Sequence, residues 1–86
     1  MGEVDKFRRG DQVVLVAIPP GLLDGLPEDD QRAIRAIIGK PVTLLGYDER
    51  GYPELHFADP FKTQSHEYSH THSIWVPPEF VKPHHP

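Results

Sequence analysis

The residues of this chain whose types could do chemistry are mostly carboxylates, and they are segregated along the sequence. Basic side chains open the chain, whereas residues 10–31 hold five acids and no lysine or arginine. Residues 48–79 hold six more acids, diluted only by Arg50 and Lys62. Carboxylates that line one cleft focus its field on a cationic ligand. We therefore expect an acidic surface that binds a cationic partner, with a merely solvated face as the alternative.

The only tryptophan of the chain is the second feature that points to binding. If Ile74 and Val76 face the protein interior, Trp75 faces outward, because side chains alternate along a strand. An exposed indole, with Phe80 close by in sequence, can take the plane of an arginine by stacking. The competing interpretation is that Trp75 fills the core. The same two interpretations apply to Phe80, whose ring can lie partly in the core and partly in the binding groove.

These two features together define the candidate partner-binding site. In the SH3 topology that the order of the predicted elements resembles, the first long loop and the turn between the second and third strands flank one groove, over an aromatic floor. Glu28, Asp29 and Asp30 also suit the positive N-terminal end of a helix, which is their structural interpretation. The candidate charge partners are Asp24, Glu28, Asp29, Asp30, Asp48, Glu49 and Glu79, and the candidate floor consists of Trp75, Pro78 and Phe80.

Three histidines, His66, His70 and His72, are spaced as H-x₃-H-x-H, and imidazoles so spaced can bind Zn²⁺ or Ni²⁺. Their polar neighbours indicate a loop without preformed geometry, so we expect no metal and no cofactor. The sequence also lacks G-x-S-x-G, H-E-x-x-H, P-loop and G-x-G-x-x-G motifs. We therefore expect a protein that is not an enzyme.

Short apolar or alternating segments predict the elements that must position these residues. Pro27, the acids after it and apolar residues at helical spacing predict one helix over residues 27–38, ended by Gly39. Two prolines interrupt the sheet pattern at residues 77–80 and predict a 3₁₀ turn. The predicted strands cover residues 12–18, 42–47, 52–58, 73–76 and 81–83.

Composition sets limits on the protein as a whole. Its 86 residues suffice for a single domain, residues 1–86, with an ordered core of about 7–83 and a disordered tail at 84–86. The chain has no cysteine, which favours the cytoplasm. A formal net charge of −4 argues against direct binding to nucleic acid or to an anionic membrane. A basic protein partner is expected instead, bound by a chain that is monomeric when free.

The order of these elements resembles a mainly β fold, a small five-stranded SH3-like barrel. One short helix lies in its first long loop, and a 3₁₀ turn precedes the last strand. Residues 75–81, Trp-Val-Pro-Pro-Glu-Phe-Val, resemble the end of SH3 domains. Residues 7–13, Phe-x-x-Gly-Asp-x-Val, resemble the opening of many bacterial SH3-like barrels. The chain lacks the Ala-Leu-Tyr-Asp-Tyr stretch of eukaryotic SH3 domains, which argues against proline-rich ligands.

Across its whole length the chain resembles the CarS-type antirepressors of the bacterial light response. The likeness includes residues 7–11, Phe-Arg-Arg-Gly-Asp, and residues 72–80, His-Ser-Ile-Trp-Val-Pro-Pro-Glu-Phe. It implies an acidic surface that imitates operator DNA and occupies the recognition helix of a MerR-type repressor, so that carotenoid genes are derepressed. Two other functions stay open: an SH3-like adaptor for proline-rich peptides, and a small accessory barrel subunit of a larger complex.

Overall fold

The computed structural model describes residues 7–63, 65, 67 and 70–84, which form one antiparallel sheet and one helix. The strands lie side by side in the order β4-β3-β2-β1-β5. This order, with the 3₁₀ turn directly before the last strand, confirms the predicted SH3-like, mainly β fold. The elements are β1 (Gln12–Leu15), α1 (Glu28–Ala36), β2 (Pro41–Tyr47), β3 (Pro53–Ala58), β4 (Thr71–Trp75), the 3₁₀ turn η2 (Pro78–Phe80) and β5 (Val81–Pro83).

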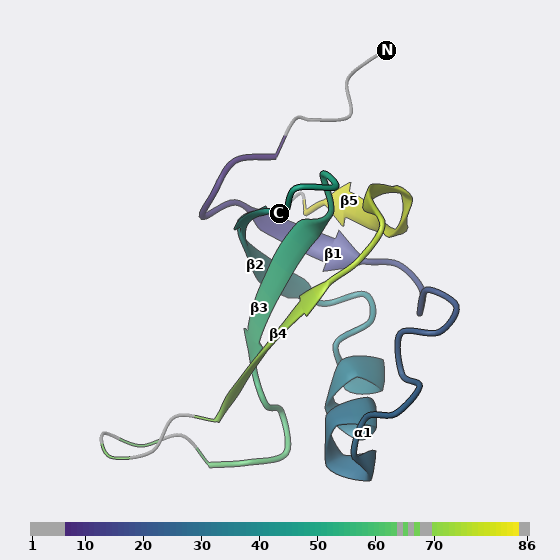
Figure 1. The fold of residues 1–86 in the computed structure, drawn as a ribbon. Coiled ribbons are helices and arrows are strands. Elements are labelled where there is room, and N and C mark those ends of the chain that lie inside the picture. Colours follow the sequence, from purple (N-terminus) through teal and green to yellow (C-terminus); the bar gives the residue numbers. More distant parts are fainter. Residues whose placement is uncertain (1–6, 64, 66, 68–69, 85–86) are drawn as a thin grey trace.

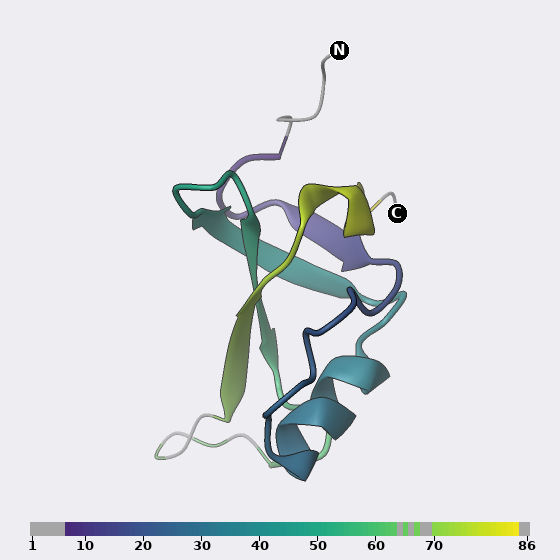
Figure 2. The ribbon, with the colours of Figure 1, turned by 45° about the vertical axis from the view of Figure 1, so that its right-hand side comes forward.

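The described chain has two distinct ends. Strands β3 and β4 form a long ribbon, and β1 and β2 lie across its direction (Figures 1 and 2). Helix α1 lies at the end where β3 finishes and β4 begins, whereas the β2–β3 turn and η2 lie at the opposite end. A strand advances about 3.3 Å per residue, so the length of β3 separates the two ends by close to 20 Å. None of the helices in the described part of the chain has the length and apolarity to cross a membrane.

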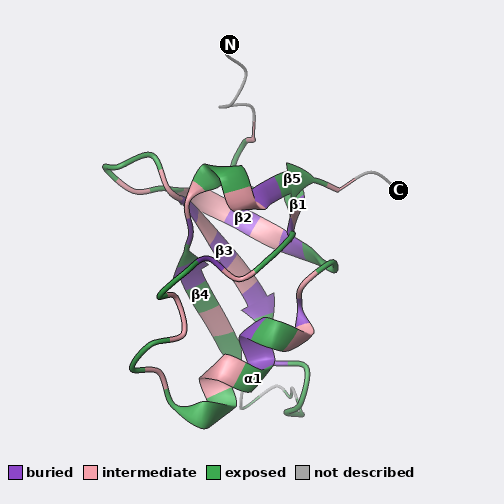
Figure 3. Cartoon of the chain, turned by 90° about the vertical axis from the view of Figure 1, so that its right-hand side faces the viewer, coloured by how far each residue is buried: buried purple, intermediate pink, exposed green. Residues whose placement is uncertain are grey.

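Alternation along the strands builds the core, as Figure 3 shows by colour. In β3, Leu55 and Phe57 are buried while Glu54 and His56 stay partly exposed, as the sequence pattern predicts. Helix α1 adds Ala33 and Ile34 and closes one side of the core. The buried apolar residues are Val13, Leu15, Ala33, Ile34, Ile37, Val42, Leu44, Leu55, Phe57, Ile74, Val76 and Val81.

The helix is shorter than residues 27–38 because its last turn tightens. The Ile37 N–H donates to the Ile34 carbonyl at 3.2 Å, three residues back instead of four. Gly39 then takes φ +83°, a left-handed conformation that suits glycine and ends the helix. At the other end Pro27 precedes the first helical residue instead of being the first.

Strand β1 also ends earlier than predicted, at Leu15 instead of residue 18. Its two partners give the reason, because Val14 faces Pro41, the first residue of β2, and Leu15 faces Val81, the first residue of β5. Beyond these pairs no described strand continues the ladder. At the C-terminus the His84 N–H donates to the Gln12 carbonyl at 3.2 Å, so pairing extends one residue past the predicted ordered core. Residues 85–86 of the predicted disordered tail lie outside the described residues.

The first prediction tests this core. Leu55 is fully buried at the centre of the sheet. We expect Leu55→Ala to lower the free energy of unfolding by about 2–5 kcal/mol, because it removes buried methyl groups and leaves a cavity. Urea denaturation followed by tryptophan fluorescence measures the change. Val16→Ala is the control, since Val16 is 39% exposed; an equal loss in both variants would contradict the assigned core.

Candidate functional site

Trp75 is the last residue of β4, and the register of the sheet places its side chain outside the core. Ile74 faces Leu55 across the β3–β4 pair and is buried, while Trp75 faces Glu54. Val76 is buried in turn, so the alternation required for an outward indole is present. Trp75 is 45% exposed. The structure thus decides between the two interpretations that the sequence left open.

The segment after Trp75 forms the rest of the predicted floor. Pro78 is exposed in η2, whereas Phe80 is half-buried and packs against the core. The Val16 N–H donates to the Phe80 carbonyl at 2.9 Å and ties η2 to the end of β1. The Val76 N–H donates to the Pro53 carbonyl at 3.2 Å, which aligns this segment with the start of β3. The Val76 end of this segment therefore lies beside the start of β3.

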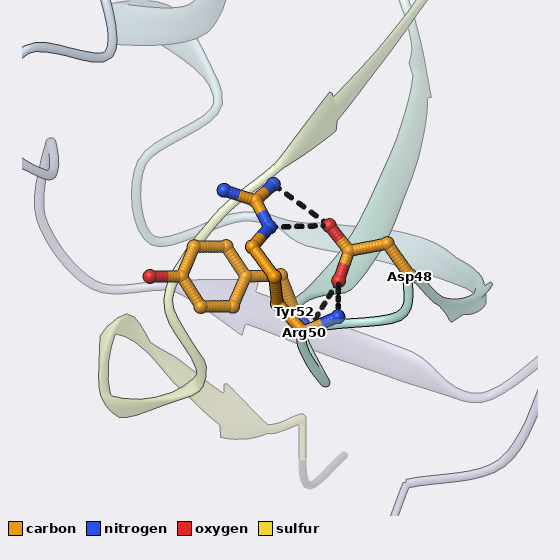
Figure 4. A network of polar contacts seen from close by, with 3 residues as sticks. All are labelled: Asp48, Arg50 and Tyr52. Atoms are coloured by element: carbon orange, nitrogen blue, oxygen red, sulfur yellow. Dashed lines mark hydrogen bonds and ion pairs between the residues drawn. The ribbon is translucent and has the colours of Figure 1, made fainter.

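That turn is organised by Asp48, whose two carboxylate oxygens serve different donors (Figure 4). Oδ1 accepts the backbone N–H groups of Arg50 and Tyr52, each at 2.9 Å. Oδ2 accepts the Arg50 guanidinium through Nε at 3.0 Å and Nη2 at 2.7 Å. Arg50 also lies over the Tyr52 ring, 4.1 Å from its centroid. The Asp48 charge is thus balanced within the turn.

The pKa of the Asp48 carboxyl reflects this arrangement. Desolvation tends to raise it, but the hydrogen bonds from the Tyr52 N–H and from Arg50 outweigh desolvation. The pKa therefore lies below its ordinary value. The hydrogen bonds to Asp48 raise the pKa of the Arg50 guanidinium, and the charge of Glu49, exposed on the same turn, adds to this effect.

The candidate acids do not gather in one groove. Asp48 and Glu49 lie at the end that carries Trp75 and η2, whereas α1 begins at the opposite end of the ribbon (Figures 1 and 2). Asp24 is exposed in the segment that connects β1 to α1. Trp75, Pro78, Glu79 and Phe80 follow one another at the end of β4 and in η2, and Asp48 and Glu49 lie in the β2–β3 turn at the same end of the sheet. Glu28, Asp29 and Asp30 lie at the opposite end, at the start of α1. The two walls expected from the sequence are therefore separate patches.

Sequence reasoning did not select Glu54 as a site residue. Its alternation with Leu55 placed Glu54 on the outer side, but only the pairing of β3 with β4 puts it beside Trp75. Cross-strand partners have Cβ atoms about 5 Å apart. We use the name Trp75 surface for the Glu54–Trp75 pair together with the exposed residues of the β2–β3 turn and η2 at the same end of the sheet, namely Glu49, Pro78 and Glu79.

A second cluster, also missed as a unit, lies at the α1 end. Asp59 follows β3 and is 4% exposed, the one buried polar residue in the described part of the chain. Its Oδ2 lies 2.8 Å from His72 Nε2, and its Oδ1 accepts the Phe61 N–H at 2.8 Å. His72 Nδ1 lies 3.8 Å from Asp30 Oδ1 on α1. We call these residues the Asp30–His72–Asp59 contact.

The Asp30–His72–Asp59 contact resembles the carboxylate–imidazole pair of a catalytic general base, but here it joins α1 to the ends of β3 and β4. A buried carboxylate that holds an imidazole orients it, as in many general bases. Here the second ring nitrogen faces another carboxylate, on α1, instead of a nucleophile. Nearby, Arg32 of α1 lies over the Phe61 ring at 4.4 Å, and Asp29 lies 4.0 Å from Lys62. The contact therefore fastens α1 to the ends of β3 and β4.

The histidine pattern considered for metal binding is divided by the fold. His72 is partly buried against Phe57, with ring centroids 5.4 Å apart, and it contacts Asp59. His70 is exposed, and His66 lies outside the described residues. Within residues 7–63, 65, 67 and 70–84, no group of three or more histidines and acids is arranged to hold a metal ion.

Comparison with known proteins gives no match, whether with family models, with curated proteins or with solved structures. The SH3-like architecture by itself does not specify an activity, because small barrels of this kind host many unrelated functions. The function therefore has to be inferred from the side chains of this chain. Two groups of them stand out, the Trp75 surface and the Asp30–His72–Asp59 contact.

The second prediction concerns acid stability. The hydrogen bonds from His72 and from the Phe61 N–H hold the pKa of the Asp59 carboxyl below its ordinary value, against burial, which raises it. A carboxyl with a lowered folded pKa stabilises the protein above its unfolded pKa of about 4, and this stabilisation is lost as pH falls through the folded value. We expect the free energy of unfolding to fall below pH about 4. Asp59→Asn should flatten this decline in denaturant titrations.

Asp48 is the necessary comparison, because the pKa of its carboxyl is lowered too. Asp48→Asn should remove a separate part of the acid-dependent decline, and the double variant should remove both. Asp24→Asn is the control at an exposed site. An Asp59→Asn profile that matches the unsubstituted protein throughout the acid range would overturn the role assigned to Asp59.

The third prediction tests what His72 does. His72→Ala leaves the buried Asp59 carboxylate without its imidazole partner, and a buried charge without a partner is costly. We expect a lower melting temperature and faster amide exchange in α1. In the Asp59→Asn background the same substitution should cost less, because the two residues act as one unit. Equal losses in both backgrounds would show that the contact contributes no coupling.

Proposed function

We propose that this chain is a non-enzymatic binding module whose Trp75 surface takes a basic segment of a partner protein. The observation that carries the proposal is the 45% exposed indole of Trp75, placed across from the Glu54 carboxylate. Tryptophan is among the residues most enriched at the hot spots of protein interfaces. Glu49 and Glu79 add exposed carboxylates from the neighbouring turns, which suits a cationic ligand.

The resemblance to CarS-type antirepressors makes the DNA-binding domain of a MerR-type repressor the proposed partner, met in the cytoplasm. A recognition helix that grips phosphates is rich in arginine and lysine. An acidic surface with a flat ring offers such a helix some of the contacts of a DNA duplex, namely negative charge and a stacking plane. Bound repressor leaves its operator, and the genes that it represses, those of carotenoid synthesis in the light response, are transcribed.

Mass action sets the condition for this mechanism. Reducing free repressor a hundredfold requires the free chain at about a hundred times its Kd for the repressor, which corresponds to about 2.7 kcal/mol of linkage. Truncation of a single hot-spot residue costs about 2 kcal/mol or more, so loss of one stacked aromatic would largely abolish this effect. Charges at the rim mainly set the association rate and its dependence on salt. The acids at the start of α1 form a separate patch, and the Glu28→Lys variant measures what they contribute to repressor binding.

The fourth prediction tests the site. We expect the purified chain to release a MerR-type repressor from its operator in a mobility-shift titration. Trp75→Ala and Glu79→Lys should each weaken this release about tenfold or more, because the first removes the stacking plane and the second reverses a charge of the Trp75 surface. Glu28→Lys makes the same change of charge at the start of α1, at the opposite end of the β3–β4 ribbon, and should have a smaller effect.

Circular dichroism of each variant confirms that the fold is kept. Release should also weaken as salt is raised, since opposite charges are screened. Failure of the unsubstituted chain to displace the repressor would contradict the antirepressor proposal. Equal losses for Glu79→Lys and Glu28→Lys would contradict the assignment of the site to the Trp75 surface.

A further inference from the structure

The described chain exposes three large aromatic side chains, and two of them already have a polar partner. Phe61, 50% exposed, lies under the Arg32 guanidinium at 4.4 Å. Tyr47, 41% exposed, donates its hydroxyl to the Phe7 carbonyl at 3.3 Å. The Trp75 side chain makes no hydrogen bond, ring contact or cation contact among the described residues. Its ring face and its indole N–H are left to a ligand.

Glu54 is unpartnered in the same way. Its carboxylate forms no hydrogen bond or ion pair in the described part of the chain, although it faces Trp75 across the β3–β4 pair. The row of outward side chains next to it is satisfied internally. In that row the Gln12 amide donates to Thr43 Oγ1 at 2.9 Å, and His56 Nδ1 lies 3.2 Å from Ser73 Oγ.

The strand beside Glu54 leaves room for a ligand. A register shift between Leu44 and Gly46 puts Gly46, which has no side chain, opposite Glu54 in β2. A Cβ atom added at Gly46 would meet no atom within 4 Å, so the space above the strand is open. The outward row thus consists of an indole, a carboxylate and an open position, in that order across three strands.

The chain itself shows which cation fits such a pair. In the adjacent turn, the Arg50 guanidinium stacks on the Tyr52 ring and makes two hydrogen bonds to the Asp48 carboxylate (Figure 4). One planar cation there satisfies an aromatic face and a carboxylate together. Lysine carries a compact ammonium that cannot stack or bond in this forked way.

We propose that Trp75 and Glu54 form a binding site for one arginine side chain of the basic partner. The guanidinium stacks on the indole face and donates hydrogen bonds to the Glu54 carboxylate. The site thereby selects arginine over lysine within a basic segment. This inference rests on the proposed function, which it deepens by naming the residue that is read.

The experiment uses Trp75 as its own reporter, since it is the only tryptophan in the chain. Two short glycine-spaced peptides of equal length and charge, one built on arginine and one on lysine, are titrated while the tryptophan fluorescence is followed. We expect the arginine peptide to bind about tenfold more tightly and to quench the indole emission.

Glu54→Gln should lower the affinity for the arginine peptide to that for the lysine peptide, because the neutral amide no longer forms the ionic fork. Glu28→Gln removes the same charge from an exposed position on α1 and should leave the preference intact. Far-UV circular dichroism checks the fold of both variants. Loss of the preference in Glu28→Gln as well would show that net charge alone is being read, and would overturn the site.

The outcomes separate this inference from the proposed function. If both peptides bind equally well while the repressor is still displaced, the arginine site is overturned and the binding module stands. If neither the peptides nor the repressor binds, both proposals are overturned. If the arginine preference is present but the repressor stays on its operator, the site stands and its partner is another arginine-rich protein.

Discussion

The register of β3 against its two neighbours is the constraint on which the rest of the structure depends. Leu55 faces Leu44 of β2 and Ile74 of β4, and these three buried side chains fix which face of the ribbon is the core. A slip of one residue would turn every side chain of a strand to the other face. Burial of this row therefore decides that Glu54 of β3 and Trp75 of the neighbouring strand β4 point outward together.

The second determinant of the architecture is the attachment of α1, which a helix of nine residues cannot maintain by its own propensity. Ala33 and Ile34 supply the apolar part of that attachment, and the contact of His72 with Asp59 and Asp30 supplies the polar part. A buried carboxylate is tolerated because it is hydrogen-bonded on both oxygens. Fixing α1 at this end also carries its three leading acids away from Trp75.

The chain has a formal net charge of −4, but its carboxylates differ in whether a cationic side chain of the protein already neutralises them. Asp48 is balanced by Arg50, and Asp59 is held by His72. The Glu54 carboxylate has no such partner among the described residues. A cationic ligand gains most from carboxylates that internal cations have not already neutralised. This distinction, more than the count of acids, directs the functional argument to the Trp75 surface.

Local chemistry allowed the sequence alone to determine the five strands, the single helix, the 3₁₀ turn and their order, because alternation, proline and glycine act over a few residues. The alternation within residues 52–58 also predicted that Leu55 and Glu54 lie on opposite faces of the sheet. Only the tertiary structure decided that Trp75 is exposed, that Glu54 is its neighbour, and that the acids of α1 and of the β2–β3 turn lie at opposite ends. Those facts depend on pairing register and on where the helix packs, and both are set by contacts between residues far apart in the chain.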